Sequence, residues 1–185
     1  MKDDIQTARV LNPDSLLKDK LMVKFGHQLA DLGCGGAGYF TLPAARLVGT
    51  KGKVYAVDIL KSSLDGVTSK AKIENLMNIE TVWSNLEQVG ATKISENTVD
   101  EALLINILFQ SRQNTNFLQE AKRLMKSGGK LLVIDWKVEP TPFGPPLQNR
   151  MTPEAIRALG EGVGFKVQEQ FEAGPYHYGL ILVKQ

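Results

Sequence analysis

The stretch ADLGCGGAGYF, from Ala30 to Phe40, places four glycines within six positions, close behind an aspartate. The residues before it, 28–32, form an apolar run typical of a buried strand, and residues 39–48 show the spacing of a helix. A glycine-rich turn between a strand and a helix lets a ligand approach the backbone closely. The stretch therefore predicts a loop that binds a nucleotide-like ligand.

The spacing of the glycines is specific. Residues 33–38 match the pattern G-x-G-x-x-G, and Asp58 ends the next expected strand about 20 residues later. These features are typical of a dinucleotide-binding site. The sequence alone thus keeps a nicotinamide-dependent reductase as one alternative.

Asp31 favours a different cofactor. The pyrophosphate of a dinucleotide lies on the glycine turn, where the Asp31 carboxylate would repel it. At roughly 5 Å and an effective dielectric constant of about 20, this repulsion costs about 3 kcal/mol. A cofactor with a cationic group beside the loop is favoured instead. S-adenosylmethionine has an ammonium and a sulfonium and carries no phosphate, so it fits.

Short apolar runs alternate with helical patterns along most of the chain, which predicts a doubly wound α/β fold with a parallel sheet. Strands are expected at residues 28–32, 53–59, 80–83, 101–106 and 130–136, and helices at 39–48, 62–75 and 114–125. Beyond a proline-rich loop, a helix is expected after Thr152, which would cap it. Residues 165–173 and 178–185 predict a hairpin-like pair of strands.

The composition is that of one globular domain: 185 residues, 43% hydrophobic and 23% charged. The net charge of +2 is too small to indicate a nucleic-acid surface. Cys34 is the one cysteine, so neither an intramolecular disulfide nor a thiolate metal site is expected. We expect a cytoplasmic protein without a membrane partner, because the sequence shows no signal-peptide pattern and no apolar run of the ~20 residues that span a membrane.

The motifs LADLGCGGAGYF (residues 29–40) and VYAVDI (residues 54–59) resemble those of the class I S-adenosylmethionine-dependent methyltransferases. Residues 123–137 and 150–165 are similar to the small methyltransferases of the ubiquinone/menaquinone biosynthesis group. The resemblance implies a Rossmann-like, seven-stranded sheet in the order 3-2-1-4-5-7-6, mostly parallel with an antiparallel last strand. It also implies an arm or lid at residues 1–24 and a cofactor-binding methyltransferase domain at residues 25–185.

The resemblance further implies how S-adenosylmethionine is held. Asp31 matches the residue that helps to hold the methionine ammonium, and Asp58 matches the acid that accepts both ribose hydroxyls. Asn85 stands near the place of an acid that accepts from the adenine amino group, although a plain turn residue is the alternative. The other expected cofactor contacts are Gly33, Cys34, Gly35, Gly38, Tyr39, Ile59, Leu86, Ile105 and Asn106.

The acceptor is less well indicated. Phe109, Gln110 and Asp135 are the candidates for substrate contact, and no general base is identified. His27 and His177 are expected to have surface or capping roles, His27 at the sheet edge opposite the cofactor and His177 in the last turn, at that remote end or near a lid. Since orientation and desolvation can supply ~7–11 kcal/mol, transfer to an already reactive nucleophile is feasible without a base.

The sequence therefore predicts an S-adenosylmethionine-dependent methyltransferase that acts on a small molecule. One alternative is a non-catalytic module that binds the cofactor. Another is a DNA or RNA amino-methyltransferase, for which residues 106–109 (NILF) keep an asparagine and an aromatic residue but lack two prolines. Residues 1–24 and 139–150 are expected to form the lid, unless the second segment is only a connection. The short lids favour either an open pocket or a homodimer that completes it.

Overall fold

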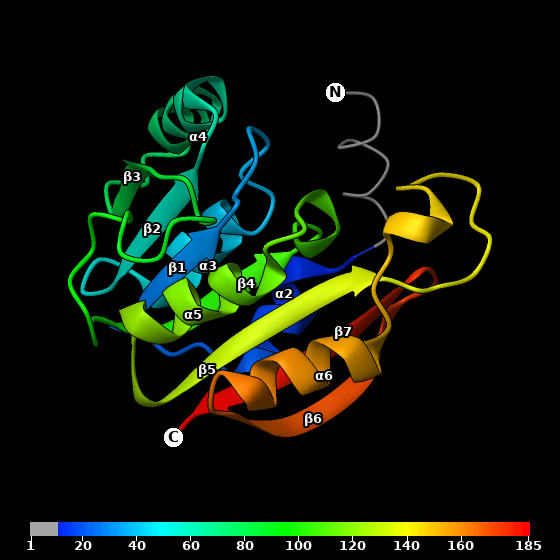
Figure 1. Cartoon of the computed structure of the whole chain (residues 1–185). Helices are drawn as coiled ribbons and strands as arrows, with labels where there is room; N and C mark the ends of the chain where they lie inside the picture. Colours follow the sequence, from blue (N-terminus) through cyan, green and yellow to red (C-terminus); the bar gives the residue numbers. More distant parts are fainter. Residues whose placement is uncertain (1–10) are drawn as a thin grey trace.

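The computed structural model describes residues 11–185, which fold around a seven-stranded sheet in the order β3-β2-β1-β4-β5-β7-β6 (Figure 1). Strands β1 to β5 pair in parallel, whereas β7 runs antiparallel to both β5 and β6. This confirms the predicted fold class and strand order. The strands are β1 (Gln28–Leu32), β2 (Lys53–Asp58), β3 (Ile79–Trp83), β4 (Val99–Ile105), β5 (Met125–Trp136), β6 (Phe165–Gly174) and β7 (His177–Lys184).

Helices cover both faces of the sheet. In Figure 1, α5 (Asn114–Leu124) and α6 (Pro153–Gly162) lie in front of it, while α2 (Pro13–Ser15) and α3 (Thr41–Val48) lie behind it. The π-helical turn η1 (Leu16–Leu21) continues α2, and α4 (Lys61–Ile73) packs beside β2 and β3. Two single 3₁₀ turns, η2 (Leu108–Gln110) and η3 (Leu147–Asn149), stand in the loops after β4 and β5.

The central strands are apolar on both faces because both faces are covered. Leu104 and Val133 pack towards α5 and α6, whereas Leu103 and Leu132 pack towards η1 and α3. Burial of each such side chain contributes about 1.5–3 kcal/mol. The alternation of these side chains along β4 and β5 fixes which residues point to each helical layer.

Element boundaries differ from the expected ones at a few points. Helix α4 follows Leu60 without a capping side chain, one residue before the expected serine start. Strand β5 begins at Met125, because this residue pairs with Val99 across a register shift, whereas residues 126–129 were expected only to stop α5. The cap of α6 is as predicted, since the Thr152 hydroxyl accepts the Ala155 N–H at 3.2 Å.

The topology creates the place for a ligand. Strand β1 pairs with β2 on one side and β4 on the other, so the chain leaves the sheet in opposite directions around β1. In open α/β sheets, ligands bind at the carboxyl ends of the strands at such a switch point. The glycine loop after β1 lies there.

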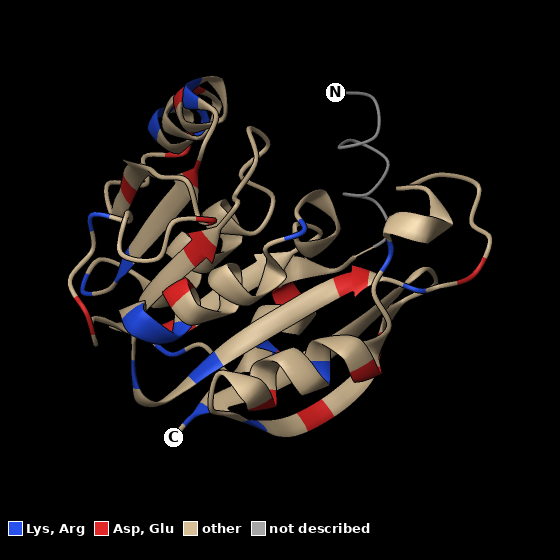
Figure 2. Cartoon of the chain, viewed as in Figure 1, with Lys and Arg blue, Asp and Glu red and all other residues tan. Residues whose placement is uncertain are grey.

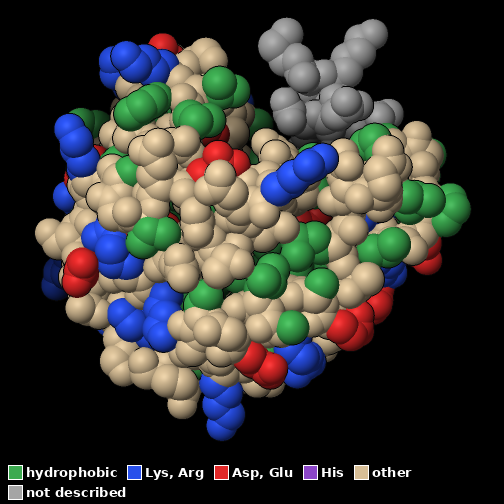
Figure 3. Space-filling model, viewed as in Figure 1, with side chains coloured by type: hydrophobic (Ala, Val, Ile, Leu, Met, Phe, Trp, Pro, Cys, Tyr) green, Lys and Arg blue, Asp and Glu red, His purple; other side chains and the backbone are tan. Residues whose placement is uncertain are grey.

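The surface carries charges of both signs. Lys and Arg are interspersed with Asp and Glu along the ribbon (Figure 2), and the face in Figure 3 shows blue and red side chains set among neutral ones. None of the helices within residues 11–185 combines the length and apolar character needed to cross a membrane.

Candidate active site

A cavity of about 790 Å³ lies at the carboxyl ends of the parallel strands. It brings together most of the residues expected to bind cofactor or substrate. Two of them do not line it: Gly38 and Asp135. The expected residues that line it are Asp31, Gly33, Cys34, Gly35, Tyr39, Asp58, Ile59, Asn85, Leu86, Ile105, Asn106, Phe109 and Gln110.

The glycine loop forms one wall of this cavity, and each of its glycines has a different structural role. A Cβ on Gly33 would lie 2.0 Å from Ile107 Cδ1, so the loop packs directly against the segment after β4. Gly35 has φ +62°, and a Cβ there would meet nothing within 4 Å. Gly38 faces Leu42 and Val67 instead, so it serves helix packing. The open space beside Gly35 is a cradle into which a ligand fits.

Asp58 fixes the shape of this cradle. Its Oδ2 accepts the Gly35 N–H at 3.0 Å, and its Oδ1 accepts the Leu60 N–H at 2.8 Å. The carboxylate thus ties the glycine loop to the start of α4. Each carboxylate oxygen can accept a further hydrogen bond. Two ribose hydroxyls are partners that this geometry suits.

Asp31 lies deeper and is 3% exposed. Burial raises its pKa to about 6; the hydrogen bond from Thr41 Oγ1, at 2.6 Å, opposes this shift, and the negative charge of Asp58 adds to it. A cation beside Asp31 would restore the ionised form. The ammonium of S-adenosylmethionine fits this position, whereas a pyrophosphate does not.

Cys34 and Tyr39 line the cavity without offering a nucleophile. Burial, with the charges of Asp31 and Asp58, raises the pKa of the Cys34 thiol far above its usual range, which keeps it protonated. Burial also raises the pKa of Tyr39, whose hydroxyl donates to the Leu11 carbonyl at 2.7 Å. Tyr39 thereby joins the glycine loop to residues near the N-terminal end of the described chain.

The loop after β3 forms the side expected to bind adenine. Asn85 Oδ1 accepts the Glu87 N–H at 3.0 Å, so the expected acceptor already has one partner. Glu87 itself lines the cavity, and its carboxylate accepts from the Ser111 hydroxyl. Sequence reasoning missed Glu87, although an acid two residues beyond Asn85 was a visible signal.

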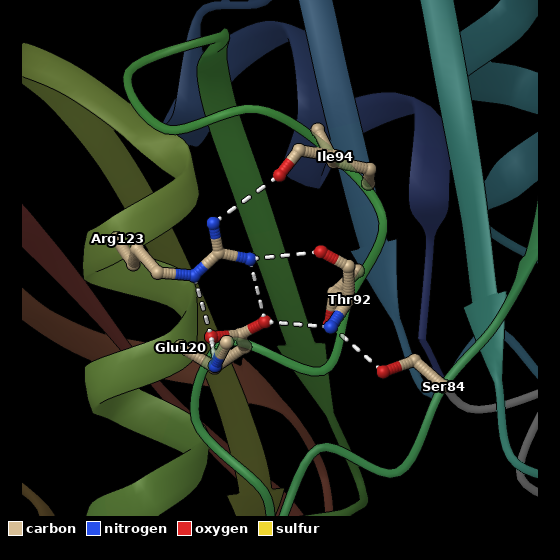
Figure 4. Close-up of polar contacts among 6 residues, drawn as sticks. Ser84, Thr92, Ile94, Glu120 and Arg123 are labelled. Carbon is tan, nitrogen blue, oxygen red and sulfur yellow. Dashed lines mark hydrogen bonds and ion pairs between the residues drawn. The ribbon is translucent and has the colours of Figure 1, made fainter.

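An ion pair on α5 holds this loop from behind (Figure 4). Glu120 accepts the N–H groups of Gly90 and Thr92 at 2.7 and 3.1 Å, and Arg123 donates to the carbonyls of Thr92 and Ile94. The Thr92 hydroxyl in turn lies 2.9 Å from that of Ser84, which lines the cavity. Burial alone would raise the pKa of Glu120, but the hydrogen bonds from Arg123, Gly90 and Thr92 outweigh it and hold the pKa at about 2.

Asn106 stands where β4 ends and the acceptor would approach. Its backbone is left-handed, with φ +53°, and its N–H donates to the Ile134 carbonyl at 2.9 Å. Its side-chain Oδ1 is buried and has no hydrogen-bond partner among residues 11–185. A strained backbone and an unpaired buried acceptor together are typical of a functional position.

Asp135 lies behind the cavity wall, in the interior. Its Oδ1 accepts the Trp136 N–H at 2.8 Å. Burial raises its pKa to about 7, against hydrogen bonds from the backbone of Trp136 and Phe109 and the charge of Arg150. Asp135 therefore supports the segment that carries Phe109 and does not face the cavity.

His177 was expected to have a surface or capping role, and this is wrong. It is the first residue of β7, it is fully buried, and its ring lies 4.2 Å from that of Trp136. The reason is the antiparallel course of β7, which starts at the carboxyl end of β5 and sets His177 opposite Trp136. His27 is as expected: it precedes β1 at the opposite edge, with Nδ1 2.6 Å from Glu101 Oε1.

The remaining lining residues were not singled out from the sequence. Several belong to the glycine loop and the starts of helices, and others to loops far apart in sequence. They are Leu11, Gly36, Ala37, Phe40, Leu60, Ser63, Ser84, Glu87, Ile107, Ser111, Phe117, Trp136, Gly144, Pro145, Pro146 and Asn149. Within residues 11–185, no group of three His, Cys, Asp or Glu side chains could hold a metal ion.

Comparisons with known proteins show the family to which the chain is related. Residues 24–168 match the family model described as a methyltransferase domain. The ubiquinone/menaquinone biosynthesis C-methyltransferase UbiE of Cronobacter sakazakii is 33% identical over 162 residues, which are 84% of this chain and 59% of that protein. UbiE of Pasteurella multocida is 34% identical over 117 residues, which are 62% of this chain and 41% of that protein. The chain thus spans about half the length of these curated relatives.

Solved structures share the whole fold. An S-adenosylmethionine-dependent methyltransferase from Aquifex aeolicus superimposes with a TM-score of 0.88 and 28% identity, covering 99% of this chain and 95% of that one. The [4+2]-cyclase SpnF, at 14% identity and a TM-score of 0.77 over 92% of this chain and 79% of its own, shares the fold alone. With the family match, these findings show that the chain belongs to the class I S-adenosylmethionine-dependent methyltransferases.

Proposed function

We propose that this chain transfers the methyl group of S-adenosylmethionine to a small, largely apolar acceptor. The observation that carries the proposal is the contrast between two sides of one cavity. One side holds the acids Asp31 and Asp58. The other, here called the acceptor side, carries no charged side chain among the described residues. It consists mainly of the apolar Leu11, Ile107, Phe109, Trp136, Pro145 and Pro146, with the polar but uncharged Asn106, Gln110 and Asn149 from the same loops.

The acid side suits the cofactor. When bound, S-adenosylmethionine supplies a methyl group on a positively charged sulfur, which leaves as a neutral thioether. Asp31 would balance the ammonium, and Asp58 would accept the ribose hydroxyls. Asn85 and Glu87 would lie beside the adenine. These roles rest on the burial of Asp31, the hydrogen bonds of Asp58 and the open cradle at Gly35.

The acceptor side suits a nucleophile that is already reactive. It carries no histidine and no acid among the described residues, so an inert hydroxyl would find no group there to take its proton. Exclusion of water by apolar side chains and alignment of the acceptor supply the rate enhancement. Asn106 lines the cavity, and its side chain would orient the acceptor by turning its buried, unpaired Oδ1 towards the cavity to accept a hydrogen bond.

The curated relatives narrow the acceptor class. Their printed name describes C-methyltransferases of ubiquinone/menaquinone biosynthesis. We extend this to the present chain as a proposal: the acceptor is a hydroxylated aromatic compound that binds with one hydroxyl already ionised. Its ring carbon then attacks the methyl group as the bond to sulfur breaks, and that carbon afterwards loses its proton to solvent. Phe109 and Trp136 both line the cavity and would offer aromatic contacts to such a ring.

Methyl transfer can be tested before the acceptor is identified. Purified protein and S-adenosylmethionine with a radiolabelled methyl group are incubated with an organic-solvent extract of bacterial cells. We expect label in small, lipid-soluble molecules, and a much weaker signal with Asp58→Ala. Tight binding of S-adenosylhomocysteine without transfer would instead support a non-catalytic module. Label in nucleic acid would support an amino-methyltransferase.

We also propose a cytoplasmic homodimer. Ile59, Leu60 and Trp83 are 51%, 59% and 54% exposed. They stand at the ends of β2 and β3, with Trp83 Nε1 donating to the Ile59 carbonyl at 2.8 Å. Ile59 and Leu60 also line the cavity, so the apolar side chain left to meet a second copy is that of Trp83, beside Ile59, where a partner would help to complete the pocket. Sedimentation at several protein concentrations tests the pairing, and a monomer throughout would refute it.

A further inference from the structure

The loop between β5 and α6 is organised around a single side chain, that of Arg150. Its Nη1 donates to the carbonyls of Lys137 and Glu139, both at 2.9 Å. Its Nε donates to the Pro145 carbonyl at 2.9 Å, and its Nη2 to the Thr141 hydroxyl at 2.6 Å. These partners span most of the loop. Only a guanidinium presents donors in a rigid planar fork that can hold such a set.

The same loop encloses Trp136. The Arg150 guanidinium lies 5.4 Å from the centre of the Trp136 ring system, and the Phe143 ring meets it edge-on at 5.8 Å. Gly144, with φ +102°, passes so close that a Cβ there would lie 2.8 Å from the indole. As a result Trp136 is only 2% exposed, although it lines the cavity.

The other neighbour of Trp136 is His177. Burial lowers the pKa of His177 to about 4, and the positive charges of Arg150 and Lys137 add to this shift. The imidazole is therefore neutral near pH 7. The Arg150 guanidinium can therefore lie over Trp136, which packs against His177, without a second full positive charge on the imidazole nearby.

We propose that Arg150 is a positioning residue for the acceptor side: it holds residues 144–146 against Trp136 in the one arrangement that closes the acceptor side of the cavity. Arg150 does not line the cavity, so it acts through Gly144, Pro145 and Trp136, which do. The inference rests on the proposed function, because it takes this side of the cavity to be where the acceptor binds.

The first test measures shielding of Trp136 and needs no acceptor. Trp83→Phe leaves Trp136 as the single tryptophan, and acrylamide quenching then reports its exposure. Adding Arg150→Ala should raise the quenching constant several-fold. Arg150→Lys should raise it nearly as much, because an ammonium cannot replace the fork. Gln148→Ala, an exposed position of the same loop that does not line the cavity, should leave it unchanged.

The second test separates positioning from general stability. We expect the affinity of Arg150→Ala for S-adenosylhomocysteine to stay within about twofold of wild type. Transfer to a dilution series of the cell extract should need several-fold more extract for half-maximal rate, with the maximal rate largely retained. The inference would be overturned if Arg150→Ala needed no more extract than wild type for the half-maximal transfer rate, or if its acrylamide quenching constant for Trp136 stayed at the wild-type value. If wild type transfers no label, the proposed function fails, while the quenching result still decides the role of Arg150 in holding the loop.

Discussion

The Thr41 hydroxyl donates a hydrogen bond of 2.6 Å to the buried carboxylate of Asp31, which joins the end of β1 to the first residue of α3 behind the glycine loop. This is the one side-chain hydrogen bond that Asp31 receives from the described part of the chain. One neutral donor does not compensate for the burial of a carboxylate, as its raised pKa shows. The site is therefore poised for a cation, and that property leads to the first prediction.

Cofactor binding should release a proton from Asp31. In the free protein its pKa is about 6, above the ordinary value of about 3.9. An ammonium beside it lowers that pKa, so the affinity for S-adenosylhomocysteine should rise as the pH increases from about 5 to about 7. Titration calorimetry in buffers of different ionisation enthalpy measures how many protons are released on binding. Asp31→Asn should abolish the release, and equal release from this variant would refute the role of Asp31.

The same shift affects stability in the free protein. Because the folded-state pKa is the higher one, the contribution of Asp31 to stability is complete below about pH 4 and is lost as the pH rises through about 6. With S-adenosylhomocysteine bound, stability should instead rise with pH, because the ligand ammonium favours the ionised form of Asp31. Thermal melts between these pH values, with and without S-adenosylhomocysteine, give the comparison.

A methyl group at Gly35 should block the ligand without unfolding the protein. Gly35→Ala adds a Cβ to the open cradle and costs about 1 kcal/mol of backbone strain. Gly128→Ala is the matched control, since Gly128 also has a left-handed backbone, with φ +76°, and nothing within 4 Å of an added Cβ. Both variants should lose similar stability, but only Gly35→Ala should lose binding of S-adenosylhomocysteine. Equal binding by the two variants would place the ligand elsewhere.

Asp58 should matter for both the ligand and the loop. Asp58→Ala removes the acceptor of the Gly35 and Leu60 N–H groups and the expected ribose contact. Hydrogen bonds to a charged group contribute about 1.5–3 kcal/mol, so affinity for S-adenosylhomocysteine should fall about 10- to 100-fold. Asp65→Asn, an exposed position of α4, serves as the control. Titration calorimetry measures both, and an unchanged affinity in Asp58→Ala would remove this residue from the site.

The ion pair of Glu120 and Arg123 should be the main acid-sensitive link behind the adenine side. Glu120 is fully buried, and its pKa of about 2 lies below the ordinary value of about 4.3. Together, the hydrogen bonds that the Glu120 carboxylate accepts from Arg123, Gly90 and Thr92 therefore contribute on the order of 3 kcal/mol above about pH 4.3, and this contribution is lost as the pH falls through about 2.

Substitution tests the same link. Glu120→Ala leaves Arg123 without its partner and should cost about 3–5 kcal/mol of unfolding free energy. Glu161→Gln, an exposed acid of α6, is the matched control and should cost little. Urea unfolding of the two variants at neutral pH measures the difference. A loss no greater than that of the control would show that the network in Figure 4 contributes little.

The acid side of the cavity could be predicted from the sequence because its chemistry is local. The strand, the glycines, the helix and Asp58 all lie within residues 28–58, and each imposes a pattern that a short window shows. The strand order was implied by the resemblance of these motifs to those of the class I methyltransferases. Glu87 was within reach of the same reasoning.

The acceptor side could not be predicted, because it depends on long-range contacts. Leu11, Ile107 and Pro145 meet only when three separate loops converge, and no local pattern fixes their course. The wrong expectation for His177 has the same origin. In a hairpin that turns at residues 175–176, the antiparallel partner, and not the turn, decides which side chains are buried. Likewise, the hydrogen bonds of Arg150 depend on the folded course of residues 137–145, which no local sequence pattern predicts.

The most direct measurement is calorimetric binding of S-adenosylhomocysteine and of NAD to the same protein at neutral pH, with Asp31→Asn beside wild type. We predict that S-adenosylhomocysteine binds, that NAD does not, and that the variant binds S-adenosylhomocysteine about 10- to 100-fold more weakly. Binding of NAD together with no binding of S-adenosylhomocysteine would contradict the claim that the buried carboxylate of Asp31 selects a cationic cofactor.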